Sequence, residues 1–317
     1  MIERLKKKIL LSIIIGGILY LAFTIYADFN QVVNTFVKFN WLLLPALLVL
    51  SLLNYLFRFF KWDYYLGVIQ VKMKKIDSLS VFMSGLIMSV TPGKLGELLK
   101  SFLVKEITNV PISKTAPIIL AERLTDFLSL LILAIVGAVV YDFGGSLSIS
   151  ISLILFFLIV LISNKNLAIP LLTKLEKIKI LRKYLANIHA AYESSYLLFK
   201  PLPLVSMTLV SLLAWGFECF GYYLILMNFD VNVGLLWASF SYGFSTIIGA
   251  VSMLPGGLGI TEGSLTFLLI QKNVSKDIAV TTTFIVRVVT LWFAVLVGII
   301  SVLFYQKRYG KITVESP

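Results

Sequence analysis

The sequence predicts an all-α polytopic membrane protein, with about six full transmembrane helices and two re-entrant broken-helix hairpins in an inverted-topology repeat. Three observations lead to this fold class: an apolar composition, an uneven distribution of Lys and Arg, and a motif that occurs twice. Hydrophobic residues make up 59% of the 317 positions, and charged residues make up only 14%. A soluble domain would not contain several apolar runs of about twenty residues.

The full spans come first along the chain and between the hairpins. Each of six apolar stretches can cross a hydrocarbon core of about 30 Å as a helix, although the fourth is short. The basic N-terminus and the apolar run after it resemble a signal peptide, but no small-residue cleavage site follows, which favours a retained span. The predicted spans are 9–27, 41–60, 116–140, 148–163, 204–228 and 280–305.

Two apolar stretches are too short and too broken to be ordinary spans. Residues 78–104 are interrupted by Pro92 and Gly93, and residues 235–271 are interrupted by the sequence LPGGLGITE. Apolar arms of about ten to fourteen residues favour re-entrant segments. Non-helical backbone at membrane depth must be buried in protein or must line a cavity. We therefore expect two re-entrant hairpins, while full spans for their arms would give the same topology.

The positive charges predict the orientation. With a cytoplasmic N-terminus, 23 of the 28 Lys and Arg residues fall in cytoplasmic segments and three fall in external loops. Cytoplasmic enrichment of Lys and Arg is the usual orientation signal. We expect a multi-pass protein of the plasma (cell) membrane with both termini in the cytoplasm.

The two broken stretches share a motif. TPGKLGE (91–97) and LPGGLGITE (254–262) both contain P-G-x-L-G, and an arginine, Arg123 or Arg287, follows the proline after 31 or 32 residues and opens an apolar helix. The first hairpin enters from the cytoplasm and the second from outside, so the repeats are inverted. In secondary transporters, inverted repeats with broken helices place the binding site at the breaks.

The chain is expected to form a single membrane domain. In residues 171–200, apolar positions recur at helical spacing and basic residues occupy the other face, which predicts an amphipathic helix on the anionic inner leaflet. Structural anchoring and lipid collection are both open roles for it. The predicted parts are the whole domain 1–317, repeat A at about 41–140, a cytoplasmic amphipathic linker at 165–200 and repeat B at about 204–305.

Four segments in order carry a family resemblance: TPGKLGELLKSFLV, ERLTDFLSLLILAIVG, LPGGLGITEGSL and RVVTLWFAVLVG. Together they resemble the membrane region of lysylphosphatidylglycerol synthases, whose free-standing relatives are called flippase-like domain proteins. The resemblance covers nearly the whole chain and implies a membrane protein that moves a lipid, or the lipid-handling part of a larger enzyme. In the synthases a soluble aminoacyl-transferase domain follows, and we expect that chemistry to be absent from these 317 residues.

The candidate substrate-binding residues lie at the two breaks and at the arginine after each. Lys94 and the helix that begins near Gly96 favour an anion, because a helix N-terminus carries partial positive charge. The alternative is that Lys94 reaches the cytoplasmic surface. Gly257 occupies the matching position, so such a role is asymmetric. The candidates are Pro92, Gly93, Lys94, Gly96, Glu97, Arg123, Pro255, Gly256, Gly257, Gly259, Glu262 and Arg287.

Acidic residues offer several roles near the breaks. Glu97 and Glu262 can each cap the helix that follows, bind a proton, or pair with Arg123 and Arg287. Arg287 is therefore expected to meet either Glu262 or a lipid phosphate.

Further acidic residues within the spans are candidates for proton coupling or charge pairing. Glu122 and Asp126 share a helical arc with Arg123, which favours contact with protein or water over simple interfacial anchoring. Glu218 lies in the middle of a span, where a carboxylate is usually functional, and Arg123 or Arg287 could be its partner.

Arg58 and Lys61, together with Trp62, lie at the end of the second predicted span. Basic and aromatic residues in this position usually anchor a helix at the membrane surface. We interpret them as interfacial anchors.

The leading functional hypothesis is a flippase-like lipid transporter that moves an anionic head group, of a phospholipid or polyprenyl-phosphate type, between the leaflets. Its partners would be anionic membrane lipids, and a homo-oligomer or a separate lipid-modifying enzyme is also possible. An intramembrane enzyme acting on lipid phosphates and a non-transporting scaffold are the alternatives. One Cys and one His rule out a Cys cluster and a multi-histidine metal site. Neither a nucleotide-binding fingerprint nor another cofactor motif is present, and we expect no cofactor and no nucleic acid.

Overall fold

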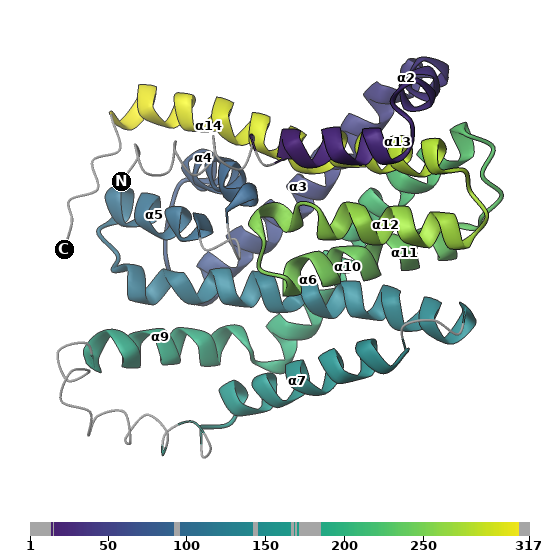
Figure 1. The fold of residues 1–317 in the computed structure, drawn as a ribbon. Helices are drawn as coiled ribbons and strands as arrows, with labels where there is room; N and C mark the ends of the chain where they lie inside the picture. The colour runs from purple at the N-terminus through teal and green to yellow at the C-terminus, as the bar shows by residue number, and fades with distance from the viewer. Residues whose placement is uncertain are drawn as a thin grey trace.

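The computed structural model describes residues 14, 16–91, 96–141, 145–165, 168, 170 and 185–310, and every regular element in these ranges is a helix. The predicted all-α class is confirmed. Three helices are long and apolar enough to cross a membrane by length and composition, namely Trp41–Val68, Pro201–Asn228 and Lys276–Tyr309. Most long helices run side by side across the view of Figure 1.

The label α marks α-helices, and η marks short 3₁₀ segments and one π-helical segment, η6. A first apolar helix, Gly16–Tyr26, precedes the labelled elements. These are α2 (Phe29–Lys38), η1 (Trp41–Leu43), α3 (Leu44–Val68), α4 (Lys75–Gly85), η2 (Leu86–Val90), α5 (Leu99–Thr108), α6 (Ile112–Tyr141), α7 (Gly145–Ser163), α9 (Leu185–Leu198), α10 (Pro201–Asn228), α11 (Leu235–Val251), η5 (Pro255–Gly257), α12 (Ile260–Gln271), α13 (Lys276–Arg287), η6 (Val288–Trp292) and α14 (Phe293–Tyr309).

Local sequence signals set several helix ends. Asp28 accepts hydrogen bonds from the backbone N–H groups of Asn30 and Gln31 and so caps α2. Pro201 begins α10, where its missing N–H costs nothing. Asn109 ends α5 in the left-handed conformation that asparagine tolerates. The helices therefore begin and end where short-range chemistry directs.

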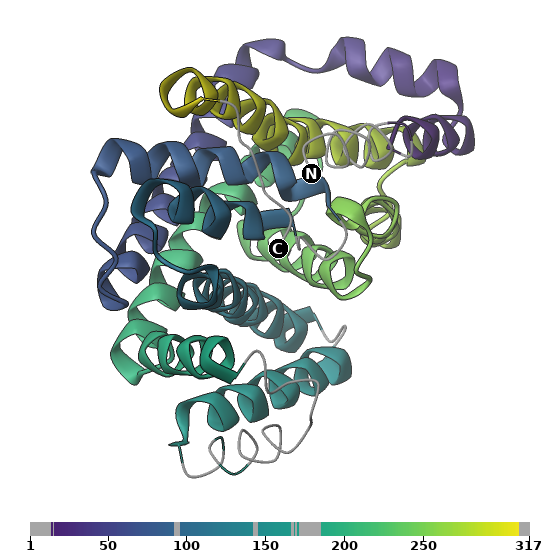
Figure 2. The same cartoon turned by 90° about the vertical axis from the view of Figure 1, so that its left-hand side faces the viewer.

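Residues 28–40, which connect the first two predicted spans, contain a helix. α2 is strongly amphipathic and packs against α13, and Thr35 donates a hydrogen bond to Asp277 at 2.7 Å. In Figure 1 α2 is seen nearly end-on while α13 and α14 run across the view, and Figure 2 shows α2 from the side. This arrangement suits a helix at a membrane surface, with one apolar face and one polar face.

Long helices extend further than the apolar runs alone indicate. α6 begins at Ile112, so Arg123 lies well inside this helix and does not open it, contrary to the prediction. The additional turns pack against the rest of the protein, since Thr115 and Ile118 are fully buried, and this packing stabilises them as helix. α3 likewise continues past residue 60 to Val68.

The described part of the predicted amphipathic linker is the helix α9. It lies along α6 and packs against α6 and α7 (Figure 1). Neighbouring helices thus cover one of its faces, and its contact with the inner leaflet stays a prediction. Residues 171–184, the other half of that prediction, lie outside the described residues.

The packing of the broken segments decides where the site lies. α4 packs on α5 and α11 packs on α12, while the short segments η2 and η5 touch each other. α14 covers α4 and η2, and α6 covers α11. Gly298 lets α14 approach the backbone of Ile87, and Gly137 makes room for Phe240. Between these layers α3 crosses α10.

Candidate functional site

A cavity of about 450 Å³ lies beside the meeting point of η2 and η5. Its volume is in the range of ligand pockets, and its wall is largely apolar. Segments from both halves of the chain contribute to it: α3, α6, α10, α11, η5 and the rod formed by α13, η6 and α14. The charged residues that line it are Arg58, Arg123, Asp126, Glu218 and Arg287.

Two glycines allow the breaks to approach their neighbours. Gly256 has a φ of 61°, and a Cβ there would lie 3.6 Å from the carbonyl oxygen of Ser89 and 3.1 Å from Leu291. Gly96 donates its N–H to Thr91 at 3.1 Å, and a Cβ there would lie 2.7 Å from the same hydroxyl. Pro92, Gly93 and Lys94 lie outside the described residues.

The second break is fixed by one buried ion pair. Glu262 accepts from the N–H of Gly259 at 2.7 Å and from Nε of Arg287 at 2.6 Å. Nη2 of Arg287 donates to the carbonyl oxygen of Gly256 at 2.5 Å. Glu262 has no exposed surface. Two of the expected roles of Glu262 are confirmed: it caps α12 and pairs with Arg287.

The first break has an equivalent pair. Glu97 forms an ion pair with Arg123, which confirms the pairing expected in this repeat. Lys100 lies between Glu97, at 3.8 Å, and Glu122, at 2.5 Å. Its ammonium group also lies 4.7 Å from the centre of the Trp62 ring, a distance typical of a cation–π contact. Glu122 is thereby placed in charge pairing behind the cavity wall.

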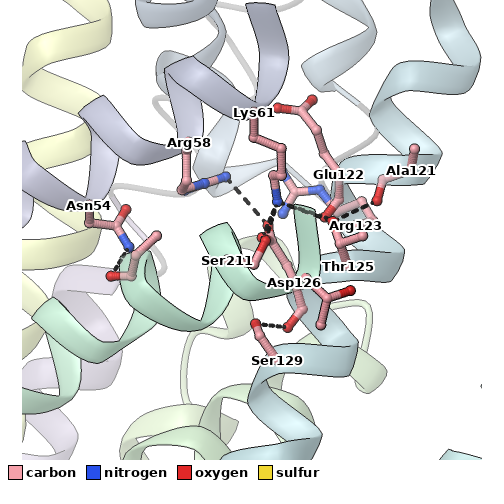
Figure 3. A network of polar contacts seen from close by, with 12 residues as sticks. Asn54, Arg58, Lys61, Ala121, Glu122, Arg123, Thr125, Asp126, Ser129 and Ser211 are labelled. Carbon is pink, nitrogen blue, oxygen red and sulfur yellow. Dashed lines mark hydrogen bonds and ion pairs between the residues drawn. The ribbon is translucent and has the colours of Figure 1, made fainter. Parts of the chain in front are cut away.

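Lys61 is at the centre of a polar network between α3, α6 and α10 (Figure 3). Its ammonium group donates to Asp126 at 2.5 Å, to Ser211 at 2.6 Å and to Thr125 at 3.2 Å. Lys61 has no exposed surface, and Arg58 is only 8% exposed. The prediction that these two residues anchor α3 at the interface is therefore wrong.

A sequence signal for this network was available. Ser51, Asn54, Arg58 and Lys61 recur at helical spacing, so that one face of α3 is polar. Because α3 continues to Val68, this face lies inside the bundle and not at its end. A polar face on an otherwise apolar helix indicates contact with protein or a cavity.

Glu218 lies on α10 and lines the cavity opposite the network. It is 7% exposed, and Oη of Tyr242 donates to its Oε2 at 2.7 Å. The sequence suggested an arginine as partner, whereas the hydrogen bond seen here comes from a tyrosine of α11. Tyr55 and Ser51 of α3 donate to the carbonyl oxygens of Thr290 and Val289 in η6, which holds this π-helical segment at the cavity edge.

The chemistry of this arrangement is binding and charge compensation. Each buried charge depends on its ion-pair partner, because removing one partner of a buried pair costs roughly 3–5 kcal/mol of folding free energy. Within the described ranges, no three His, Cys, Asp or Glu side chains are grouped to hold a metal ion. The cavity combines arginines, which suit phosphate, with an apolar wall, which suits hydrocarbon.

The membrane region of lysylphosphatidylglycerol synthases is the family whose sequence model matches residues 9–298. The chain belongs to this family. The expected resemblance is thus confirmed, and this family member is a membrane protein. It is 28% identical over 223 residues to a UPF0104 membrane protein of Methanocaldococcus jannaschii, covering 68% of this chain and 92% of that relative.

A second relative of this lysylphosphatidylglycerol synthase family member is similar over nearly its full length. It is a UPF0104 membrane protein of Pyrococcus horikoshii, 24% identical over 329 residues, which cover 95% of this chain and 98% of that relative. Both names describe membrane proteins, in agreement with the long apolar helices.

Proposed function

We propose that this protein moves an anionic lipid head group between the two leaflets of the cell membrane, with the cavity as the binding site. The observation that carries the proposal is the position of this cavity, where η2, just before the first break, meets η5 of the second break, and where three arginines line the wall. Broken helices that meet at a polar cavity are the usual binding-site architecture of secondary transporters. The family supports a role with membrane lipids.

The re-entrant hairpins are part of this proposal. α5 has 10 residues and α12 has 12, so each is roughly 15–18 Å long at about 1.5 Å per residue. That length is about half of a hydrocarbon core of about 30 Å. The other two arms are longer: α4 is continued by η2 to Val90, and α11 has 17 residues. The returning arms α5 and α12 would then begin inside the membrane.

The exchange of packing partners supports an inverted-topology repeat. The hairpin of repeat A packs against α14 of repeat B, and the hairpin of repeat B packs against α6 of repeat A. Arg123 lies eleven residues after the start of α6, and Arg287 lies eleven residues after the start of α13. Each arginine pairs with the glutamate that follows its own break.

Two further segments extend the repeat into α3 and α10. SLLNYLFRFFKW (51–62) and SLLAWGFECFGY (211–222) align without gaps. Asn54 donates to the carbonyl oxygen of Ala214 at 2.8 Å, and these are equivalent positions in the alignment. Equivalent positions meet where two helices cross at a two-fold axis. In this alignment Arg58 corresponds to Glu218, so the repeats place opposite charges at the cavity.

In the proposed mechanism the head group enters the cavity while the acyl chains stay in lipid along the apolar wall. Arginine donors replace the water that the phosphate loses, which lowers the cost of bringing a charge to mid-membrane. Rocking of one repeat against the other would open the cavity to each leaflet in turn. Both termini lie in the cytoplasm in this proposal, in accordance with the 23 cytoplasmic Lys and Arg residues.

A vesicle assay tests the function. Purified protein is reconstituted in phosphatidylcholine vesicles with a trace of fluorescently labelled phosphatidylglycerol, with and without a proton gradient. Dithionite then quenches the outer-leaflet label, and translocation is expected to make the inner-leaflet label accessible too. Lack of extra quenching under both conditions contradicts the proposal. Formation of free phosphate or of a new lipid species would instead favour the intramembrane enzyme.

A further inference from the structure

The basic residues around the cavity differ in how well their charges are compensated. Four of them have a carboxylate within ion-pair distance of 2.6 Å or less: Lys61 with Asp126, Lys100 with Glu122, Arg123 with Glu97 and Arg287 with Glu262. Arg58 is the exception among the described cavity residues. Its nearest paired carboxylate oxygen is Oδ2 of Asp126, at 3.9 Å.

Arg58 also lacks a full set of hydrogen bonds. It is 8% exposed, and its Nε is buried with no hydrogen-bond partner among the described residues. A buried donor without an acceptor is costly, and a buried charge is costlier still. Figure 3 shows its guanidinium directed across a gap toward Asp126. The side chain lines the cavity, so an acceptor in that space could reach it.

One oxygen of the Asp126 carboxylate is already committed to other donors. This Oδ1 accepts from Lys61 at 2.5 Å and from Ser211 at 3.0 Å. Lys61 has no exposed surface and donates to several fixed partners, so it cannot turn away from Asp126. The other oxygen, Oδ2, lies 3.9 Å from Nη2 of Arg58 and has no hydrogen-bond partner among the described residues, so this ion pair is loose and the Nε donor of Arg58 stays available to the cavity.

We infer that Arg58 is the phosphate-binding residue of the cavity, and that its ligand is the phosphate group of a lipid head group. A guanidinium presents parallel N–H donors that match two phosphate oxygens, which a lysine cannot do. The assignment rests on the proposed function for its lipid source. The apolar wall that continues from the same cavity fits the start of the acyl chains.

Native mass spectrometry of the detergent-purified protein tests this assignment. The protein is titrated with phosphatidylglycerol, and separately with diacylglycerol, which has the same chains but no phosphate. Wild type is expected to retain phosphatidylglycerol and not diacylglycerol. Arg58→Gln should weaken retention roughly ten- to hundredfold, because a hydrogen-bonded contact to a charged group is lost.

Two further variants separate binding from folding. Arg58→Lys keeps the buried charge but lacks the parallel N–H donors of a guanidinium, so it should show intermediate retention of phosphatidylglycerol. This variant preserves the test if Arg58→Gln does not fold. Arg308→Gln is the matched control, because Arg308 pairs with Asp77 outside the cavity and is half exposed. It should retain phosphatidylglycerol like wild type.

Inorganic phosphate is added as a competitor for the bound phosphatidylglycerol. Displacement of the lipid shows that the phosphate group suffices for binding, and no displacement shows that the acyl chains are required.

The outcomes distinguish the assignment from the proposed function. Unchanged phosphatidylglycerol retention in Arg58→Gln and Arg58→Lys overturns the assignment, even if vesicles still show translocation. Equal retention of phosphatidylglycerol and diacylglycerol by wild type overturns it as well. Arg58-dependent retention without translocation by wild type supports the phosphate site and removes the transport proposal.

Discussion

Arg287 reaches back along the chain to Glu262, with its Nε 2.6 Å from Oε1, and so joins the end of α13 to the first turn of α12. In the other repeat Arg123 makes the same connection to Glu97. Each helix break is therefore held by the helix that follows its own hairpin. The second Arg287 bond, to the carbonyl oxygen of Gly256, holds the break itself.

The Glu262–Arg287 pair is expected to act as a single unit in stability. Glu262→Ala and Arg287→Ala should each destabilise the protein by roughly 3–5 kcal/mol, because each leaves an unpaired buried charge. The double variant should cost much less than the sum of both. Thermal unfolding in detergent measures the coupling.

The exposed pair Lys165–Glu193 is the control for this cycle, with side-chain exposures of 41% and 58%. Its coupling should be about 1 kcal/mol or less. Additive losses for Glu262 and Arg287 would show that the pair does not hold the break.

The network behind Arg58 yields a prediction about a residue that does not line the cavity. Lys61→Met should free Asp126 to pair with Arg58, which lies 3.9 Å away. Retention of phosphatidylglycerol should then fall by roughly tenfold, as for loss of a charged hydrogen bond. Adding Asp126→Asn to Lys61→Met removes the competing carboxylate and should restore retention. Native mass spectrometry of both variants measures this, and a double variant as weak as the single one would contradict it.

The sequence predicts the parts of the fold that depend on short-range chemistry. The lengths of the apolar runs predict α3, α6, α7, α10 and the rod of α13, η6 and α14. The motif P-G-x-L-G predicts where both helix breaks occur in the sequence. Pairing of the two glutamates with the two arginines is one of the roles that the sequence leaves open, and the structure shows it in both repeats.

The rest depends on which helices become neighbours. Arg58 and Lys61 look like anchors while α3 is taken to end near residue 60, and their burial follows only once α6 and α10 cover that face. The Tyr242 partner of Glu218 comes from α11, a helix whose distance from α10 in space the chain order does not give. α9 likewise has a helical pattern, but only the packing on α6 fixes its direction.

The orientation can be tested by labelling single cysteines in intact cells, in a background with buried Cys219 replaced by Ser. Cysteines at Ser146 and Lys276 are expected to react with an impermeant maleimide from outside, because both precede spans at the external side of the proposed topology. A cysteine at Lys75, which is exposed at the start of α4, should react only after the membrane is permeabilised. Labelling of Lys276 only after permeabilisation would contradict the inverted repeat.

The last prediction concerns Gly256, where the second break faces the first. A side chain there would meet Leu291 and approach the carbonyl oxygen of Ser89, at a φ of 61°. Gly256→Ala should cost about 1–2 kcal/mol of backbone strain and should also push the two breaks apart. Gly310→Ala is the control for a positive φ away from the breaks, because Gly310 has a φ of 86° with nothing within 4 Å of its added Cβ. Both variants should lose some stability in thermal unfolding, but only Gly256→Ala should lose lipid translocation in vesicles. If Gly256→Ala translocates like the Gly310 variant, close contact between the breaks is not needed for transport, and the breaks serve only to pack the two hairpins.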